Sequence, residues 1–271
     1  MKGPLSALLR GSPEDLRTWI ENPGNDKLRL CSLVILGAFG LYGLTVGIWR
    51  DPLMGCYVAI KMPLLIFLTL AGNGFLNGIL GILLGSGLGF RQSLMAQLMS
   101  FTIAALVLGS LSPVTFFMAW NAPASDAPNA ASAHAHFMVA HTVLIALAGI
   151  IANLHLARLL LVVTPSRSRT AAPTLFAWLA GNAFLGAQLS WIMRPFFGTP
   201  SIEVAFLRPQ PFNGTFYETV WRSLQQITDG QGTLVLILLA LVIFLLHAPV
   251  IRLLSRSANP IGSPSGGRPS D

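Results

Sequence analysis

Charged residues are scarce in this chain of 271 residues. Asp, Glu, Lys and Arg together make up 10% of it, whereas hydrophobic residues make up 53%. A soluble globular domain carries about 25% charged residues, because its surface must face water. The mean hydropathy of +0.66 points the same way. The composition therefore excludes an ordinary soluble domain and indicates that lipid surrounds much of the chain.

Cysteine is almost absent, since Cys31 and Cys56 are the only two in the sequence. This number excludes a disulfide framework, and the spacing is not that of metal ligands. On the topology predicted below, the two thiols lie near opposite faces of the bilayer. We therefore expect no disulfide within one chain.

Acidic residues are missing from the long apolar stretches, because all ten Asp and Glu fall in tails or loops. Cation-coupled transporters usually keep a carboxylate in the membrane, so its absence speaks against that class. The sequence also lacks a Gly-x-Ser-x-Gly elbow, a His-Glu-x-x-His helix and an intramembrane Asp pair. We expect a non-catalytic protein. The alternative is an enzyme site at the outer face, built from Arg194, Glu203, Arg208, Tyr217 and Glu218.

Six long apolar stretches are present. About 20 helical residues, at 1.5 Å each, cross a hydrocarbon core of about 30 Å. The stretches are 28–49, 52–84, 94–120, 137–163, 175–193 and 233–254. They predict an all-α integral membrane bundle of six transmembrane helices. The predicted organisation is a cytoplasmic N-terminal segment (1–27), a transmembrane domain (28–254) with an outer loop (194–232), and a disordered cytoplasmic tail (255–271).

The net charge of +7 comes from cations dispersed over several short polar segments. This pattern is typical of membrane topology and does not indicate a nucleic-acid partner. With the N-terminus inside, twelve of the 17 Lys and Arg fall in the cytoplasm and four outside, while Lys61 lies within a span. Basic residues set orientation far more than acidic ones do. We therefore expect an inner (plasma) membrane protein with both termini in the cytoplasm.

The N-terminal segment contains a helix-start signal, with Ser12 as N-cap and Pro13 at the first helical position. Leu16, Trp19 and Ile20 then form a short apolar face. The pattern predicts a helix lying at the membrane interface. A weakly ordered cytosolic tail is the alternative.

The outer loop contains a second helix start. Thr215 and Glu218 have the spacing of a capping box. Apolar residues then recur at helical spacing, at Phe216, Val220, Leu224 and Ile227. We expect an amphipathic interfacial helix on the outer membrane surface.

Polar residues within the apolar stretches are the candidate functional contacts, because they cost free energy in lipid. Lys61 lies either near the middle of the bilayer or close enough to the outer interface for its side chain to extend into it. A functional alternative is that Lys61 contacts an anion or a lipid headgroup. The amides of Asn73, Asn77 and Gln188 are expected to join helices by hydrogen bonds. Arg194 stands at the outer end of the fifth stretch.

Glycine pairs four residues apart occur in two stretches, at Gly43 with Gly47 and at Gly74 with Gly78. Such small-xxx-small patterns let neighbouring helices approach closely in membranes. They predict packing faces and carry no functional assignment.

Three histidines, His134, His136 and His141, resemble a metal cluster by residue type. Helical residues two apart point about 200° from each other, so His134 and His136 could share a metal only on irregular backbone. We expect polar helix-start residues, with a metal site as the alternative. His155 and His247 both lie near the cytoplasmic ends of their spans, where a pair of imidazoles could flank a haem. No cofactor is predicted.

Short motifs resemble bacterial membrane proteins that are loosely similar to the Yip family. They are Gly40-Leu41-Tyr42-Gly43 and the segments 59–65 and 108–113, while the segment 188–196 resembles one that recurs in uncharacterised polytopic bacterial proteins. The resemblance implies a polytopic, non-enzymatic membrane protein. It transfers no functional residues to this chain.

These observations predict a non-catalytic scaffold or partner subunit of a membrane assembly, in contact with lipid and other membrane proteins. The alternative is a transporter or flippase for a lipid or for an apolar or anionic solute, with Lys61 and Arg194 as anion contacts. A metal- or haem-binding membrane protein is the further alternative.

Overall fold

Helices account for most of the computed structural model. It describes residues 6, 8–9, 13–84, 88–163, 168–198, 202–218 and 221. Within these ranges the elements are helices, turns and loops, without a β-strand. The helices are α2 (Pro13–Glu21), α3 (Asn25–Gly47), α4 (Pro52–Leu83), α5 (Phe90–Asn121), α6 (Ala130–Val163) and α7 (Ser168–Ile192).

Five of these helices are long and apolar enough to cross a membrane. The candidate spans are Asn25–Gly47, Pro52–Leu80, Phe90–Asn121, Ser132–Leu161 and Pro173–Ile192. They match the first five apolar stretches of the sequence, whereas the sixth stretch (233–254) and the tail (255–271) lie outside the described residues. The chain is therefore an all-helical multi-pass membrane protein, with five spans in its described part.

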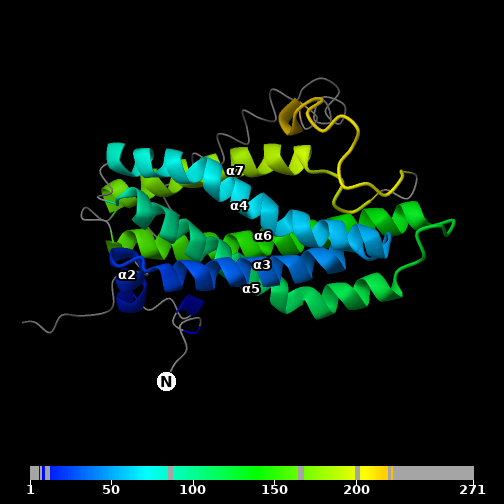
Figure 1. The fold of residues 1–271 in the computed structure, drawn as a ribbon, viewed down its shortest axis with the longest axis horizontal. Coiled ribbons are helices and arrows are strands. Elements are labelled where there is room, and N and C mark those ends of the chain that lie inside the picture. Colours follow the sequence, from blue (N-terminus) through cyan, green and yellow to red (C-terminus); the bar gives the residue numbers. More distant parts are fainter. Residues whose placement is uncertain are drawn as a thin grey trace, which may run out of the picture.

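The long helices run roughly along the long axis of the molecule (Figure 1), with α2 near one end and the described part of residues 194–218 on the α7 side toward the other. We call these the α2 end and the loop end. Helix α4 is continuous over 32 residues despite Pro63, which makes it about 48 Å long. It exceeds the hydrocarbon core, so it must tilt or extend beyond it. Because the helix is longer than the hydrocarbon core, the sequence did not define which of its residues lie within the membrane.

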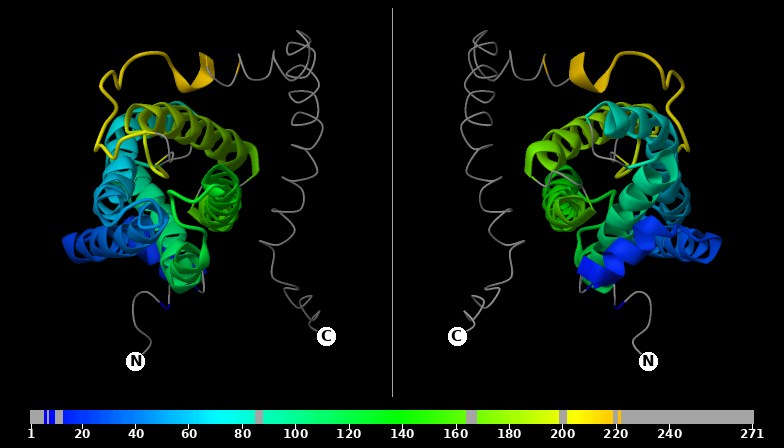
Figure 2. Two further views of the ribbon diagram at one scale, coloured as in Figure 1. Left: turned by 90° about the vertical axis from the view of Figure 1, so that its right-hand side faces the viewer. Right: turned by 90° about the vertical axis from the view of Figure 1, so that its left-hand side faces the viewer.

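Glycine brings α3 and α4 into close contact. A Cβ atom at Gly43 would lie 2.5 Å from the carbonyl oxygen of Val58, and one at Gly47 would lie 2.6 Å from that of Met54. Gly78 packs against α5 in the same way, because its Cβ would lie 2.9 Å from a ring carbon of Phe90. The predicted glycine faces are thus packing faces. Viewed along the helices (Figure 2), α7 lies between α4 and α6, and α6 packs on α5, α7 and α2.

The predicted N-terminal helix is present as α2, and it docks on α5 and α6. Trp19 and Ile20 are buried. Lys27 donates hydrogen bonds to the carbonyl oxygens of Thr18 (3.2 Å) and Asn22 (3.1 Å), and its ammonium lies 5.6 Å from the centre of the Trp19 ring. Residues 13–21 are therefore helical, with Trp19 and Ile20 packed inside the bundle, and the expected position of this helix at the membrane interface stays a prediction.

The predicted cap near the end of the 194–218 loop is present in part. The backbone N–H of Glu218 donates to the Thr215 hydroxyl at 3.0 Å, and helical residues begin at Phe216. Most of the expected amphipathic helix, including Val220, lies outside the described residues. That helix stays a prediction.

Candidate functional site

Lys61 is fully buried, with 0% of its surface exposed. Its ammonium donates a hydrogen bond to the carbonyl oxygen of Pro195 at 2.7 Å. It also lies 5.0 Å from the ring centre of Phe206 and 5.7 Å from that of Phe196. Cation–π contact and a charge-assisted hydrogen bond both stabilise a desolvated ammonium. The sequence did not predict this covering, in which the loop folds back over α4.

Further hydrogen bonds fasten the 194–218 loop to the bundle. They join Arg50 Nη2 to the Ile202 carbonyl (3.3 Å), the Phe216 N–H to Gln188 Oε1 (3.2 Å), Trp191 Nε1 to the Asn213 carbonyl (3.3 Å) and the Tyr217 hydroxyl to the Phe184 carbonyl (2.5 Å). Gln188, expected to join two helices, instead holds this loop. The described part of the loop is therefore held against α7 and against Arg50 by hydrogen bonds.

Arg194 lies at the start of this loop. Its guanidinium carbon is 3.8 Å from the centre of the Trp191 ring, and its Nη2 donates to the Asn213 carbonyl at 3.4 Å. Burial, together with the positive charge of Arg208, lowers the pKa of the Arg194 guanidinium. Arg194 and Lys61 thus both bond to residues of the 194–218 loop, but they share no partner.

The amides of α4 face α7. Asn73 Nδ2 donates to Asn182 Oδ1 at 2.8 Å, as expected of an interhelical amide. Gly181 makes room for this pair, because a Cβ there would lie 3.1 Å from Asn73 Oδ1. Asn77 is also fully buried, and Trp178 Nε1 donates to its backbone carbonyl at 3.1 Å. The side-chain amide of Asn77 has no hydrogen-bond partner among the described residues.

His141 belongs to a buried aromatic cluster. Its Nδ1 shares a hydrogen bond with the Tyr42 hydroxyl at 2.7 Å. Its ring centre lies 4.4 Å from that of Phe137 and 5.7 Å from that of Phe197. This cluster joins α3, α6 and the loop. The partner of His141 could not be read from the sequence, because Tyr42 lies 99 residues away.

The other histidines have separate contacts. His136 Nδ1 donates to the Ser132 carbonyl at 2.8 Å, and the His134 ring lies 5.9 Å from that of Trp49. Within the part of the chain that the structure describes, no three His, Cys, Asp or Glu side chains gather as a metal site would require. His155 Nδ1 bonds to the carbonyl of its own helix at 2.9 Å, and His247, its suggested haem partner, is outside the described residues.

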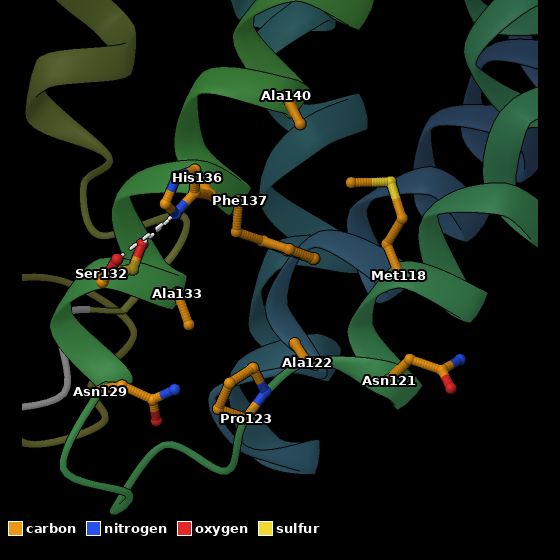
Figure 3. A pocket seen from close by; sticks show the side chains of 10 residues that line it. All are labelled: Met118, Asn121, Ala122, Pro123, Asn129, Ser132, Ala133, His136, Phe137 and Ala140. Atoms are coloured by element: carbon orange, nitrogen blue, oxygen red, sulfur yellow. Dashed lines mark hydrogen bonds between the residues drawn. The ribbon is translucent and has the colours of Figure 1, made fainter.

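An open groove of about 580 Å³ lies between the loop-end turns of α5 and α6. Figure 3 shows Met118 of α5 on one side and Ala133, His136, Phe137 and Ala140 of α6 on the other. Ala122, Pro123 and Asn129, from the segment between the two helices, complete the lining together with Asn121 and Ser132. The groove was not predicted from the sequence. The small residues spaced along the start of α6 were the one sequence feature that could have indicated it.

Comparison with known proteins gives no match: neither a protein-family model, nor a curated protein, nor a solved structure is similar to this chain. Three features of the molecule remain that could indicate a function, namely the groove, the covered lysine and the polar interior. Of these, the groove is open to an occupant, whereas Lys61 is already enclosed by the loop.

Proposed function

We propose that this chain is a non-catalytic partner subunit of a membrane assembly, and that the α5–α6 groove receives a helix of another membrane protein. The observation that carries the proposal is the open groove itself, with its mainly apolar lining of Met118, Phe137 and small residues. Small residues let a second helix backbone approach closely within a membrane. A groove between two helices is also a recurrent docking site for a third.

Helices α5 and α6 are joined on both sides of the groove region. Toward the α2 end, the Ser100 hydroxyl of α5 donates to the Ala152 carbonyl of α6 at 3.2 Å. At the loop end, Phe137 of α6 packs with Trp49 and with Ala119 of α5. Ala133 and Ala140 lie beside the open space. A partner helix would contact alanines there without displacing a large side chain of this chain.

The first prediction is that Ala140→Trp, which fills the groove, abolishes co-purification of a stoichiometric partner in mild detergent. Met138→Trp is the matched control. It adds the same ring two residues away, on the opposite side of α6, where Met138 is exposed. The control should retain the partner. Subunit stoichiometry can be measured by native mass spectrometry.

Two outcomes would contradict the proposal. In the first, the unmodified protein purifies as a single monodisperse chain. In the second, a photo-crosslinker at Ala133 reacts within the chain, with residues 222–254, which would assign the groove to the chain's own segment. Loss of the partner with Met138→Trp as well would show that the tryptophan acts through general damage to α6.

A transporter or flippase is the second candidate, favoured by polar atoms in the interior. Ser93, Gln97 and Asn77 are fully buried within candidate spans, and their side-chain atoms lack hydrogen-bond partners among the described residues. Buried polar groups normally have partners, and a polar solute or water would supply them. A monodisperse chain in the co-purification experiment would favour this candidate.

We further propose that the protein lies in the cell inner membrane, with both termini and the α2 end in the cytoplasm, on the support of its distribution of cations. In a Cys56→Ser background, an impermeant maleimide added to intact cells should label Asp126→Cys at the loop end. Asn22→Cys, near α2, should react only after permeabilisation. The reverse pattern would overturn the orientation. The Yip-like resemblance agrees with a non-enzymatic role and stays a prediction.

A further inference from the structure

A second cavity, of about 340 Å³, opens at the surface of the 194–218 loop. It is lined by Arg194, Arg208, Pro209, Gln210 and Asn213. The α5–α6 groove shares none of these residues. The inference below therefore does not rest on the proposed function.

The two arginines of this cavity have unused hydrogen-bonding capacity. The Nε atoms of Arg194 and Arg208 are both buried and lack a partner among the described residues. Arg194 uses Nη1 on the Trp191 carbonyl and Nη2 on the Asn213 carbonyl, which leaves Nε as its unused donor. Arg208, by contrast, makes no hydrogen bond to any described residue. An unsatisfied buried donor costs free energy that a ligand with acceptor oxygens would recover.

Among the described residues, neither arginine of the cavity forms an ion pair with an acidic side chain. Glu203 lines the neighbouring small cavity together with Arg208, but it forms no ion pair with either arginine. The mutual repulsion contributes, after burial, to the lowered pKa of Arg194. An anion placed between two guanidinium groups would replace this repulsion with attraction.

We infer that this cavity binds a phosphate group, carried by a phospholipid headgroup or as the free anion. Guanidinium groups match the oxygens of phosphate in geometry and form charge-assisted hydrogen bonds with them. Gln210 adds an amide donor, because its Oε1 already accepts from Asn213 Nδ2 at 3.0 Å. The Trp191 ring beneath Arg194 is a side chain typical of the headgroup level, which places a lipid phosphate within reach.

The test is binding of phosphatidylglycerol and of inorganic phosphate to the full-length protein in a neutral detergent. Native mass spectrometry would detect the lipid, and isothermal titration calorimetry the inorganic anion. Arg208→Gln should weaken binding by at least about tenfold, since it removes charge-assisted hydrogen bonds. Arg208→Lys keeps the positive charge but lacks the planar guanidinium with its two parallel donors. It should therefore weaken binding less than Arg208→Gln does. Arg91→Gln, at the α2 end, is the matched control and should bind as the unmodified protein does.

The two probes distinguish the source of the phosphate. Binding of the lipid alone assigns the site to a headgroup, whereas binding of both probes shows that the phosphate group suffices. The inference is overturned if the unmodified protein binds neither probe. It is equally overturned if Arg208→Gln binds both as tightly, or if Arg91→Gln weakens binding as much. Thermal melting of each variant confirms that the comparison is made between folded proteins.

Discussion

Gly43→Leu is expected to prevent assembly of the bundle. The added Cβ would lie 2.5 Å from the carbonyl oxygen of Val58 and 2.9 Å from its carbonyl carbon. Both atoms belong to the α4 backbone, so no side chain can rotate away to make room. Overpacking a tight contact costs about 1–3 kcal/mol or more. Here two helices would have to separate. The expected results are a much lower melting temperature in detergent and an aggregated profile in size-exclusion chromatography.

Gly37→Leu provides the matched control on the same helix. A Cβ at Gly37 would meet no atom within 4 Å, and its position is exposed on the bundle. This variant should melt within a few degrees of the unmodified protein. Equal stability of the two leucine variants would contradict the close α3–α4 contact.

Lys61→Met is expected to release the 194–218 loop. The substitution removes the ammonium that donates to the Pro195 carbonyl and lies against Phe206. It leaves that carbonyl without its donor, and hydrogen bonds to charged groups contribute about 1.5–3 kcal/mol. Hydrogen–deuterium exchange should therefore rise in segment 195–213, whereas the spans should keep their protection.

Lys27→Met tests whether the effect is local. Lys27 makes similar contacts at the other end of the molecule, with two carbonyl oxygens and the Trp19 ring. Its replacement should raise exchange in α2 and leave the loop protected. The covering of Lys61 would be contradicted if Lys61→Met left exchange in the loop unchanged, or if Lys27→Met raised it equally.

The spans were predictable because a bilayer imposes a length on each apolar run. The boundaries near Trp49 and Met193 agree with helix ends at Gly47 and Ile192 to within two residues. The glycine faces were also predictable, since a four-residue spacing places Gly43 and Gly47 on one side of a helix. Local sequence thus defined the helices and some of their contacts.

The candidate sites were not predictable in the same way, because their partners are distant in sequence. Lys61 and Pro195 are 134 residues apart. Nothing near Lys61 indicates that a loop will cover it, so the sequence left its depth undecided. Arg194 and Arg208 line one cavity only because the 194–218 loop folds back on itself. Each arginine alone resembles an ordinary interfacial cation.

The hydrogen bond between Lys61 and Pro195 has a consequence for synthesis of the chain. α4 must enter the bilayer long before the ribosome has made the residue that accepts this bond, 134 positions later. An unpaired lysine within a membrane helix costs free energy during insertion, up to about 2.5–3.5 kcal/mol when it lies at the helix centre. Until the loop arrives, the apolar residues of α4 must offset that cost. The nascent N-terminal hairpin is therefore less stable than the same two helices in the finished protein.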